Sequence, residues 1–105
     1  MTHITEVTQN TLPSTEGLLV LDFSATWCGP CRSYTPIFHQ VASETGSDKI
    51  SFASVDIDKN PKLAAKFGIQ AVPTTVILSS GTKVAAQPGA IPKAQLQALI
   101  SSYSG

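Results

Sequence analysis

Two cysteines stand three positions apart, at Cys28 and Cys31, and they are the only cysteines of the chain. On the first turn of a helix, side chains at i and i+3 have β-carbons about 5–6 Å apart, so a disulfide can close with little backbone movement. As a staple the pair is weak, because closing a loop of four residues stabilises a fold by only about 2 kcal/mol, against about 3 kcal/mol for fifteen. The spacing indicates redox chemistry rather than stabilisation.

Thiol exchange requires a thiolate, and the start of a helix favours one at Cys28. Free N–H groups and the positive end of the helix dipole lie at this position. The dipole alone contributes about 0.3–1 kcal/mol, which is less than one pH unit, so neighbouring N–H groups and the Cys31 thiol must contribute as well. Pro30 stiffens the turn, and Gly29 leaves space for another chain. We expect Cys28 to be exposed and Cys31, one turn deeper, to be shielded.

A zinc site is the competing interpretation of a close cysteine pair. It requires two further ligands at a compatible spacing, and the remaining soft ligands are His3 and His39, which lie far apart in the sequence. We therefore expect no metal site. His39 is expected to be a polar residue on a helix, and His3 a residue at the edge of a strand.

The cysteine pair follows a buried strand and opens a long helix. Residues 18–23 form an apolar run that contains one carboxylate, Asp22, as in a strand covered on both faces. An unpaired carboxylate there would cost several kcal/mol if it stayed charged, so Asp22 should titrate high, unless it is solvated or hydrogen-bonded at a strand end. The helix is predicted over residues 29–45, because one apolar face is formed by Tyr34, Ile37, Phe38, Val41 and Ala42.

The remaining chain alternates strands and helices and ends in a hairpin and a helix. Strands are predicted over residues 50–57, 74–78 and 83–87, the last two antiparallel, with a weaker strand over residues 3–7. Asn60 and Pro61 supply the N-cap and first position of a short helix that ends at Gly68. A final helix opens at Pro92, and its side facing the sheet carries Leu96, Leu99, Ile100 and Tyr103. This order predicts one three-layer α/β domain over residues 1–105, built on a mixed sheet.

Composition excludes several classes of protein. Hydrophobic residues make up 42% of the 105 residues and charged residues 13%, which excludes a disordered tail and a charge-driven nucleic-acid binder. The net charge is zero, although every acid lies at or before Asp58 and five lysines follow it without one. There is no export signal and no apolar run long enough to span a bilayer, so we expect a soluble cytoplasmic protein with no membrane partner.

The chain resembles the thioredoxin family over nearly its whole length. The resemblance is carried, in order and spacing, by Asp22-Phe23, Trp27-Cys28-Gly29-Pro30-Cys31, Pro36, Asp56-Ile57-Asp58, Asn60-Pro61, Phe67-Gly68-Ile69, Val72-Pro73-Thr74 and Gly89-Ala90. It implies the thioredoxin fold, with a central five-stranded sheet and four flanking helices. It also implies a protein-disulfide reductase in which Cys28 and Cys31 form a redox-active disulfide.

The resemblance assigns roles to residues around the cysteines. It implies that Asp22 takes the proton of Cys31, through water. It also implies a cis Val72-Pro73 bond, which sequence alone would give odds of only about 5–6%. The Val72 backbone would then pair with an extended substrate segment, without demanding a particular side-chain sequence. Trp27 is expected on the apolar rim of the reacting sulfur, and the substrate groove is completed by Gly29, Pro30, Pro73 and Gly89.

The chain has no nucleotide-binding fingerprint, so electrons must come from a partner. By resemblance this is a thioredoxin reductase that uses NADPH or ferredoxin, with no cofactor bound to the chain itself. The other partners are diverse disulfide-containing proteins, and we expect a monomer. Two rivals remain: a disulfide oxidase or isomerase, which Gly29-Pro30 disfavours, and a binding subunit or chaperone that does not need the cysteines.

Three positions depart from the common family pattern. Ser24 stands where many members have a second Trp, and Pro88 stands where an apolar residue usually precedes Gly89. Ser54 stands where many bacterial members place a Lys near the buried Asp. Asp22 therefore lacks an expected charge partner, and the loop beside Cys28 is stiffer than usual.

Overall fold

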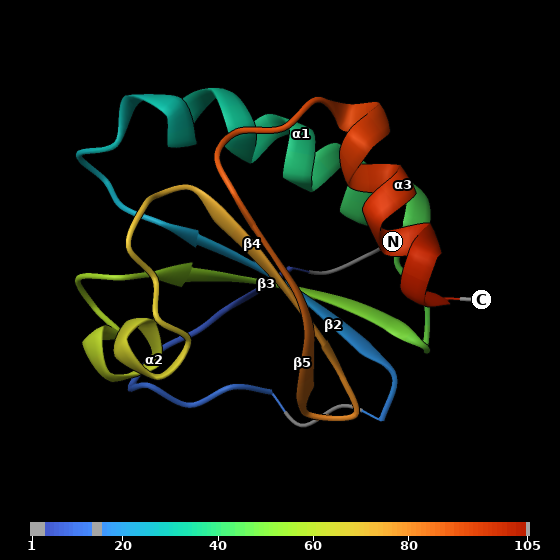
Figure 1. The fold of residues 1–105 in the computed structure, drawn as a ribbon, viewed down its shortest axis with the longest axis horizontal. Coiled ribbons are helices and arrows are strands. Elements are labelled where there is room, and N and C mark those ends of the chain that lie inside the picture. The colour runs from blue at the N-terminus through green and yellow to red at the C-terminus, as the bar shows by residue number, and fades with distance from the viewer. Residues whose placement is uncertain (1–3, 14–15, 105) are drawn as a thin grey trace.

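Five strands form one mixed sheet in the order β1-β3-β2-β4-β5 in the computed structural model, which describes residues 4–13 and 16–104 (Figure 1). Both β1 and β2 run parallel to β3, whereas β4 is antiparallel to β2 and β5 is antiparallel to β4. The elements are β1 (Ile4–Glu6), β2 (Leu18–Ser24), α1 (Gly29–Thr45), β3 (Ile50–Asp56), α2 (Pro61–Lys66), β4 (Thr74–Ser79), β5 (Thr82–Pro88) and α3 (Lys93–Ser104). Each agrees closely with an element predicted from the sequence. His3, in the first predicted strand, lies outside the described residues.

The helices cover both faces of the sheet, as the three-layer prediction requires. Figure 1 shows α1 and α3 on one side and α2 on the other. On the first side Phe38 of α1 and Leu96 of α3 pack against β2, β3 and β4, and on the second Leu63 of α2 packs against the opposite face of the same strands. Side chains alternate between faces along a strand, so even-numbered residues of β2, such as Val20, lie under α1. Asp22 shares that face.

Three helices, rather than the expected four, are present in the described residues. In the connection between β1 and β2, Gln9 and Asn10 both have positive φ, at 57° and 56°, and a bridge joins Thr8 to Thr11. Two successive left-handed residues end any right-handed helix, so this stretch is a tight turn. The sheet and the other helices are those of the expected fold.

Asn60 is the N-cap residue of α2 and Pro61 its first residue, as predicted, but Asn60 does not supply the capping hydrogen bond. Its side chain is fully buried and its Nδ2 donates to the carbonyl oxygens of Val7 and Asp56. The capping hydrogen bonds come from Asn10, whose Oδ1 accepts from the backbone N–H groups of Lys62 (2.9 Å) and Leu63 (3.3 Å). A residue fifty positions away satisfies these orphan donors, and so ties the β1–β2 connection to α2.

The C-terminal hairpin and helix follow the prediction with one exception. Ser80 and Gly81, with φ of 48° and 86°, form the two-residue turn between β4 and β5, where two positive φ values suit the twist of the strands. In α3, Leu96 and Ile100 are buried and Leu99 packs against the core, but Tyr103 is 42% exposed. Tyr103 lies in the last turn of the helix, past the edge of the face that packs on the sheet.

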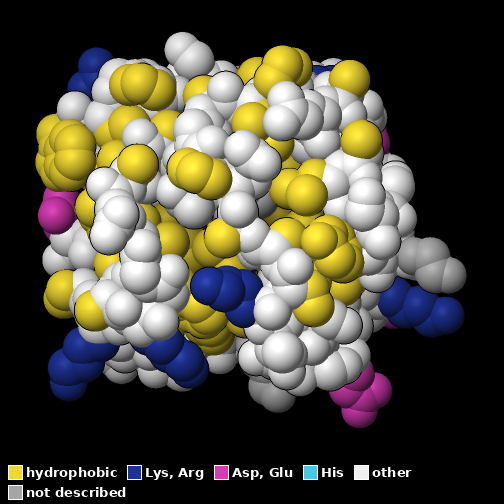
Figure 2. All heavy atoms as spheres, in the orientation of Figure 1, with side chains coloured by type: hydrophobic (Ala, Val, Ile, Leu, Met, Phe, Trp, Pro, Cys, Tyr) yellow, Lys and Arg dark blue, Asp and Glu magenta, His cyan; other side chains and the backbone are white. Residues whose placement is uncertain are grey.

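No helix of the described part of the chain has both the length and the apolar character of a membrane span. Figure 2 shows the face that carries β4 and β5, where Lys and Arg side chains are scattered and Asp and Glu side chains lie at the margins.

Candidate active site

Cys28 and Cys31 form a disulfide at the start of α1, where the sequence places them. Their Cα atoms are 5.3 Å apart, within the ordinary range for this bond. Cys28 is the N-cap residue, with extended backbone angles, and its Sγ accepts a hydrogen bond of 3.2 Å from the backbone N–H of Cys31. Gly29 and Pro30 fill the exposed first turn between them. One of the free N–H groups at the helix start, that of Cys31, is therefore directed at the Cys28 sulfur.

The prediction that Cys28 is exposed is wrong for this disulfide form. Cys28 and Cys31 are each only 4% exposed. As the N-cap, Cys28 turns its sulfur inward over the first helical turn, and both cysteines pack in a small cluster with Ala25, Ile57 and Val72. The expectation for Cys31 is confirmed. Access to the Cys28 sulfur therefore depends on the chain segments that surround it as well as on its place at the helix start.

Two loops meet on the outer side of the disulfide. The Val72-Pro73 peptide bond is cis, as the resemblance implies, and the Val72 carbonyl oxygen lies 3.5 Å from Cys28 Sγ. The backbone N–H of Gly89 donates to the Pro73 carbonyl oxygen at 2.7 Å, and Gly89 has a φ of 92° that glycine adopts without strain. The structure thus brings Val72, Pro73 and Gly89 together beside Cys28, from segments far apart in the sequence.

Trp27 lies beside the cysteines and is 65% exposed. Its Nε1 donates to Oδ2 of Asp58 at 2.9 Å. Asp58 had no predicted role, although it was one of the residues that carry the family resemblance. The sequence does contain a signal for such a role, because the Trp27 indole N–H needs a hydrogen-bond acceptor that fixes the orientation of the ring beside the reacting sulfur.

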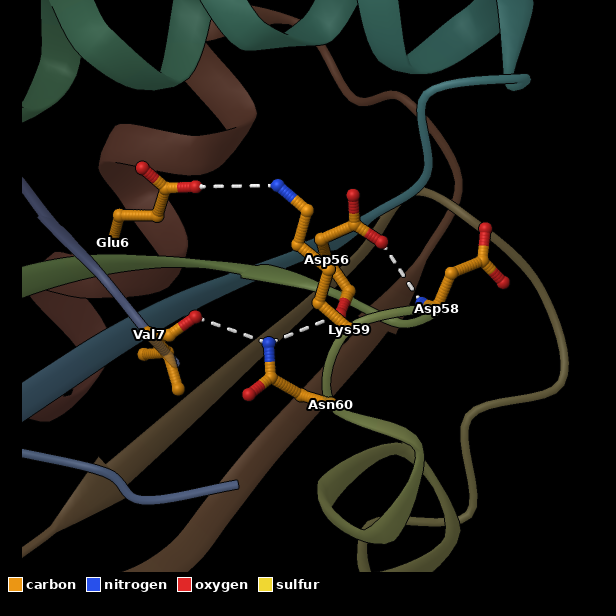
Figure 3. A network of polar contacts seen from close by, with 6 residues as sticks. All are labelled: Glu6, Val7, Asp56, Asp58, Lys59 and Asn60. Atoms are coloured by element: carbon orange, nitrogen blue, oxygen red, sulfur yellow. Dashed lines mark hydrogen bonds and ion pairs between the residues drawn. The ribbon is translucent and has the colours of Figure 1, made fainter. Parts of the chain in front are cut away.

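A polar network holds the turn that carries Asp58 (Figure 3). The backbone N–H of Asp58 donates to Asp56 Oδ1 at 2.8 Å, and the Asn60 amide bridges the carbonyl oxygens of Val7 and Asp56. Lys59 Nζ lies 4.0 Å from Glu6 Oε1, in an exposed pair that contributes little energy. These bonds hold the turn after β3 against the end of β1. They also hold the backbone of Asp58, whose carboxylate accepts the hydrogen bond from Trp27.

Asp22 lies under α1 and is 2% exposed. Burial raises its pKa to about 7, and its Oδ1 has no hydrogen-bond partner. The raised pKa has the direction predicted from the sequence, and the burial and the free Oδ1 do not fit the alternative of a carboxylate that is solvated or hydrogen-bonded at a strand end. Its neighbour in register on β3 is Ser54, so the uncharged residue that departs from the family pattern stands directly beside it.

A hollow of about 250 Å³ opens beside Cys31. Most of the residues that line it are of polar type, among them Ser24, Thr35, Ser54, Asp56 and Lys59. A polar space of this size can hold water with several hydrogen-bond partners. Ser24 and Ser54, two of the departures from the family pattern, both line this hollow together with Cys31.

Two hydroxyl residues near Asp22 were missed as site candidates. The Tyr34 hydroxyl and Thr75 Oγ1 are 2.6 Å apart and both residues are fully buried. Tyr34 was assigned only to the apolar face of the helix, and Thr75 only to an apolar strand. The available signal was that a buried tyrosine hydroxyl needs a polar partner.

The remaining positions singled out in the sequence lie where their residue types suggest. Pro88 is exposed at the end of β5, immediately before Gly89. His39 is exposed on α1, and His3 falls outside the described residues. In the described part of the chain, no three His, Cys, Asp or Glu residues lie close enough to hold a metal ion.

Comparison with known proteins agrees with the fold and the site. The thioredoxin family model matches residues 2–102. A thioredoxin of Malassezia sympodialis is 40% identical over 87 residues, which cover 83% of this chain and 82% of that protein, and one of Bacillus subtilis is 36% identical over 90 residues, covering 86% of each. The solved structure of a Malassezia sympodialis thioredoxin superposes with a TM-score of 0.88 at 31% identity, over 100% of this chain and 94% of that one. The chain therefore belongs to the thioredoxin family and is a thiol–disulfide oxidoreductase.

Proposed function

We propose that this protein reduces disulfides of other proteins, with Cys28 as the attacking thiolate and Cys31 as the resolving thiol. The observation that carries the assignment is the hydrogen bond from the Cys31 backbone N–H to Cys28 Sγ at the start of α1. An N–H group that points at sulfur favours the thiolate over the thiol. Cys31 lies deeper along the helix and is positioned to attack only a partner already attached to Cys28.

The reaction is two successive exchanges. The Cys28 thiolate attacks one sulfur of the substrate disulfide and forms a mixed disulfide with it. The substrate S–S bond breaks, and the released substrate thiolate takes up a proton. Cys31 then loses its proton and attacks Cys28 Sγ. The mixed disulfide breaks, the second substrate thiolate leaves and is protonated, and the Cys28–Cys31 bond forms. Two electrons pass from the cysteine pair to the substrate.

Asp22 is proposed as the acceptor of the Cys31 proton. It lies under α1 with a free Oδ1, and its pKa of about 7 lets it both accept and release a proton near neutral pH. Water in the polar hollow beside Cys31 would carry the proton between the two groups and on to solvent. Many bacterial members of the family have a lysine at the position of Ser54, and its charge would lie near Asp22. The smaller, uncharged Ser54 leaves room for water there instead.

The substrate segment is proposed to lie along Val72, in the groove that Pro73 and Gly89 complete. The Val72 carbonyl oxygen faces the Cys28 sulfur, so backbone groups rather than selective side chains are what a substrate meets first. Pairing through the backbone gives affinity with little sequence preference. Trp27, Gly29 and Pro30 form the exposed rim on the helix side.

Recharging requires a partner reductase. The cysteine pair itself carries the electrons, so no bound cofactor is needed, and we propose a thioredoxin reductase that draws on NADPH or ferredoxin. The protein is proposed to act as a monomer in the cytoplasm, where a dithiol stays reduced.

Single-cysteine variants test the order of the two attacks. The Cys31→Ser protein should accumulate a stable mixed disulfide through Cys28, detected as a mass increase that dithiothreitol removes. The Cys28→Ser protein should be inactive, because the remaining Cys31 does not lie at the helix start, where the free N–H groups favour a thiolate. If Cys28→Ser instead forms the adduct at a comparable rate, the assignment of attacker and resolver is reversed. If the double serine variant keeps the protein's effect on a disulfide substrate, the function is binding rather than reduction.

The proton role of Asp22 is tested by stopped-flow kinetics on a disulfide-bonded peptide. Asp22→Asn should slow release of the reduced peptide by about 10-fold or more while the first attack keeps its rate. Equal changes in the two steps would contradict proton transfer from Cys31.

A further inference from the structure

Three polar side chains form a row across the sheet beneath α1. Asp22 on β2 is in register with Ser54 on β3 and with Thr75 on β4. Residues directly opposite each other on adjacent strands project to the same face, with Cβ atoms about 4.5–5.5 Å apart in an antiparallel pair. This is the face that Val20 and Phe52 share with α1. Asp22 therefore has a hydroxyl neighbour on either side.

The Thr75 hydroxyl is bound from above by α1. Its Oγ1 lies 2.6 Å from the hydroxyl oxygen of Tyr34, and either atom can be the donor. Cys31 is three residues before Tyr34 on the same helix, so both point to the same side, toward the sheet. The same face of α1 therefore carries Cys31, the resolving cysteine, and Tyr34, which hydrogen-bonds to Thr75 beside Asp22.

The hydrogen-bond inventory of this pair allows two arrangements. A threonine hydroxyl and a tyrosine hydroxyl each have one hydrogen to donate and can accept at the same time. In one arrangement Thr75 donates to Tyr34 and has nothing left for Asp22. In the other, Tyr34 donates to Thr75, which frees the Thr75 hydrogen for the carboxylate. Asp22 Oδ1 has no hydrogen-bond partner in this structure, so the Thr75 hydroxyl does not yet reach it, and the second arrangement requires the Asp22 carboxyl group to rotate toward Thr75.

We propose that Tyr34 and Thr75 are a positioning pair for Asp22: when Asp22 is ionised, its carboxylate rotates to accept a hydrogen bond from the Thr75 hydroxyl, and Tyr34 supplies the replacement hydrogen to Thr75. The inference rests on the proposed role of Asp22 as proton acceptor and gives the reason that it can hold a charge without a lysine nearby. The pair favours the ionised carboxylate and so favours proton transfer from Cys31. No bond forms or breaks at Tyr34 or Thr75 apart from these hydrogen bonds.

Few other groups near Asp22 could stabilise its ionised carboxylate. On α1, the buried ionisable groups are Cys31 and Tyr34, while the residues beside Asp22 on the neighbouring strands, Ser54 and Thr75, are uncharged. Burial, opposed by the Thr75 hydrogen bond and reinforced by the charge of Asp22, raises the pKa of Tyr34 to about 12. Tyr34 therefore remains a donor throughout the working pH range, and its hydroxyl lies close enough to Asp22 to feel its charge. Glu6, Asp56, Lys59 and Arg32 lie farther out, at the hollow beside Cys31.

The direct test is a ¹³C NMR titration of the Asp22 carboxyl carbon in the oxidised protein, where no cysteine titrates. Thr75→Val should raise the pKa of Asp22 by about one pH unit, since a hydrogen bond to a charged group is lost. Tyr34→Phe should raise it by less, because Thr75 can still donate. The double variant should equal Thr75→Val, because Tyr34 acts only through Thr75, and Thr75→Ser should restore the wild-type value.

Thr74→Val is the matched control. Thr74 is also a buried threonine of β4 but lies on the opposite face, where its hydroxyl donates to the Ala71 carbonyl oxygen. It should leave the pKa of Asp22 unchanged. An unchanged pKa in a folded Thr75→Val protein overturns the proposal, whatever Asp22→Asn does to release. A raised pKa with no effect of Asp22→Asn on release supports the positioning pair and overturns the proton role of Asp22.

Discussion

The two cysteines of the disulfide have different surroundings. On the outer side, Cys28 meets the carbonyl oxygen of Val72, a loop fastened by the Gly89 N–H, and an exposed Trp27. On the inner side, Cys31 lies on the helix that covers a row of polar side chains, Ser54, Asp22 and Thr75, of which Asp22 and Thr75 are buried. Backbone groups dominate the first environment and side chains the second.

This difference separates the tasks of the two cysteines. Backbone geometry survives most changes of side chain, so the attack by Cys28 should tolerate substitution unless the loop conformation itself is altered. Proton transfer from Cys31 depends on the ionisation of one buried carboxylate, which responds to each neighbouring polar atom. Inner substitutions should therefore change resolution and pH dependence, and outer ones should change attack.

The largest effect is expected for the stability of Asp22→Asn. The folded protein keeps the Asp22 proton up to a pKa of about 7, whereas an unfolded chain loses it near 3.8. Between these values the unfolded state binds fewer protons, so the free energy of unfolding falls as pH rises. Asparagine removes this loss, and the variant should gain up to about 4 kcal/mol over the wild type above pH 7, with no gain near pH 3. Urea denaturation at both pH values measures it.

Glu44→Gln is the control of opposite sign. The hydrogen bond from Lys93 lowers the pKa of Glu44, so this carboxylate stabilises the fold above its unfolded pKa and loses that effect as pH falls. The variant should be slightly less stable than the wild type at pH 7 and equal to it at low pH. A gain for both variants at pH 7 would show that the Asp22 result reflects surface charge rather than burial.

A smaller effect is expected for the Gly89 loop on the outer side. Gly89→Ala places a side chain at a φ of 92°, which costs about 1 kcal/mol and displaces the N–H that binds the Pro73 carbonyl oxygen. Gly81→Ala imposes the same strain at a φ of 86° in the hairpin turn, at the far end of β4. Both variants should lose similar stability, but only Gly89→Ala should slow the first attack, by several-fold. Equal attack rates would remove the loop from the substrate groove.

The smallest effect is expected for the Trp27 rim. Trp27→Phe keeps an aromatic ring but loses the hydrogen bond from Nε1 to Asp58, which contributes about 1 kcal/mol at most at an exposed position. The rate of first attack should fall about twofold to threefold, with resolution unchanged. Asp58→Asn keeps an acceptor oxygen and should change the rate less. Slower resolution in either variant would contradict the separation of the two sides.

The elements and the reactive pair could be predicted because their signals are local. Apolar periodicity gave α1 and α3, turn residues gave the β4–β5 hairpin, and spacing gave the disulfide. Asp22 was found because a carboxylate inside an apolar run has few structural explanations. These features depend on residues that are neighbours in the sequence.

Three of the errors involve partners that are distant in the sequence. The burial of Cys28 depends on Val72, 44 positions away, and the capping hydrogen bonds of α2 come from Asn10 rather than from Asn60. The hydroxyl pair of Tyr34 and Thr75 appears only once the register of β2 and β4 is known. The apolar periodicity of the helix predicts that the Tyr34 ring is buried, but it carries no information about the hydroxyl group, which is the part of Tyr34 that lies near Asp22.

The most direct test of the account is the pH dependence of alkylation of the reduced protein by iodoacetamide, followed site by site by mass spectrometry. The account predicts that at pH 7 Cys28 reacts many times faster than Cys31 and faster than free cysteine, because the helix start favours its thiolate. Its rate should fall only at pH values well below the ordinary thiol pKa of about 8.5. Alkylation of Cys28 no faster than free cysteine, or preferential alkylation of Cys31, would contradict it.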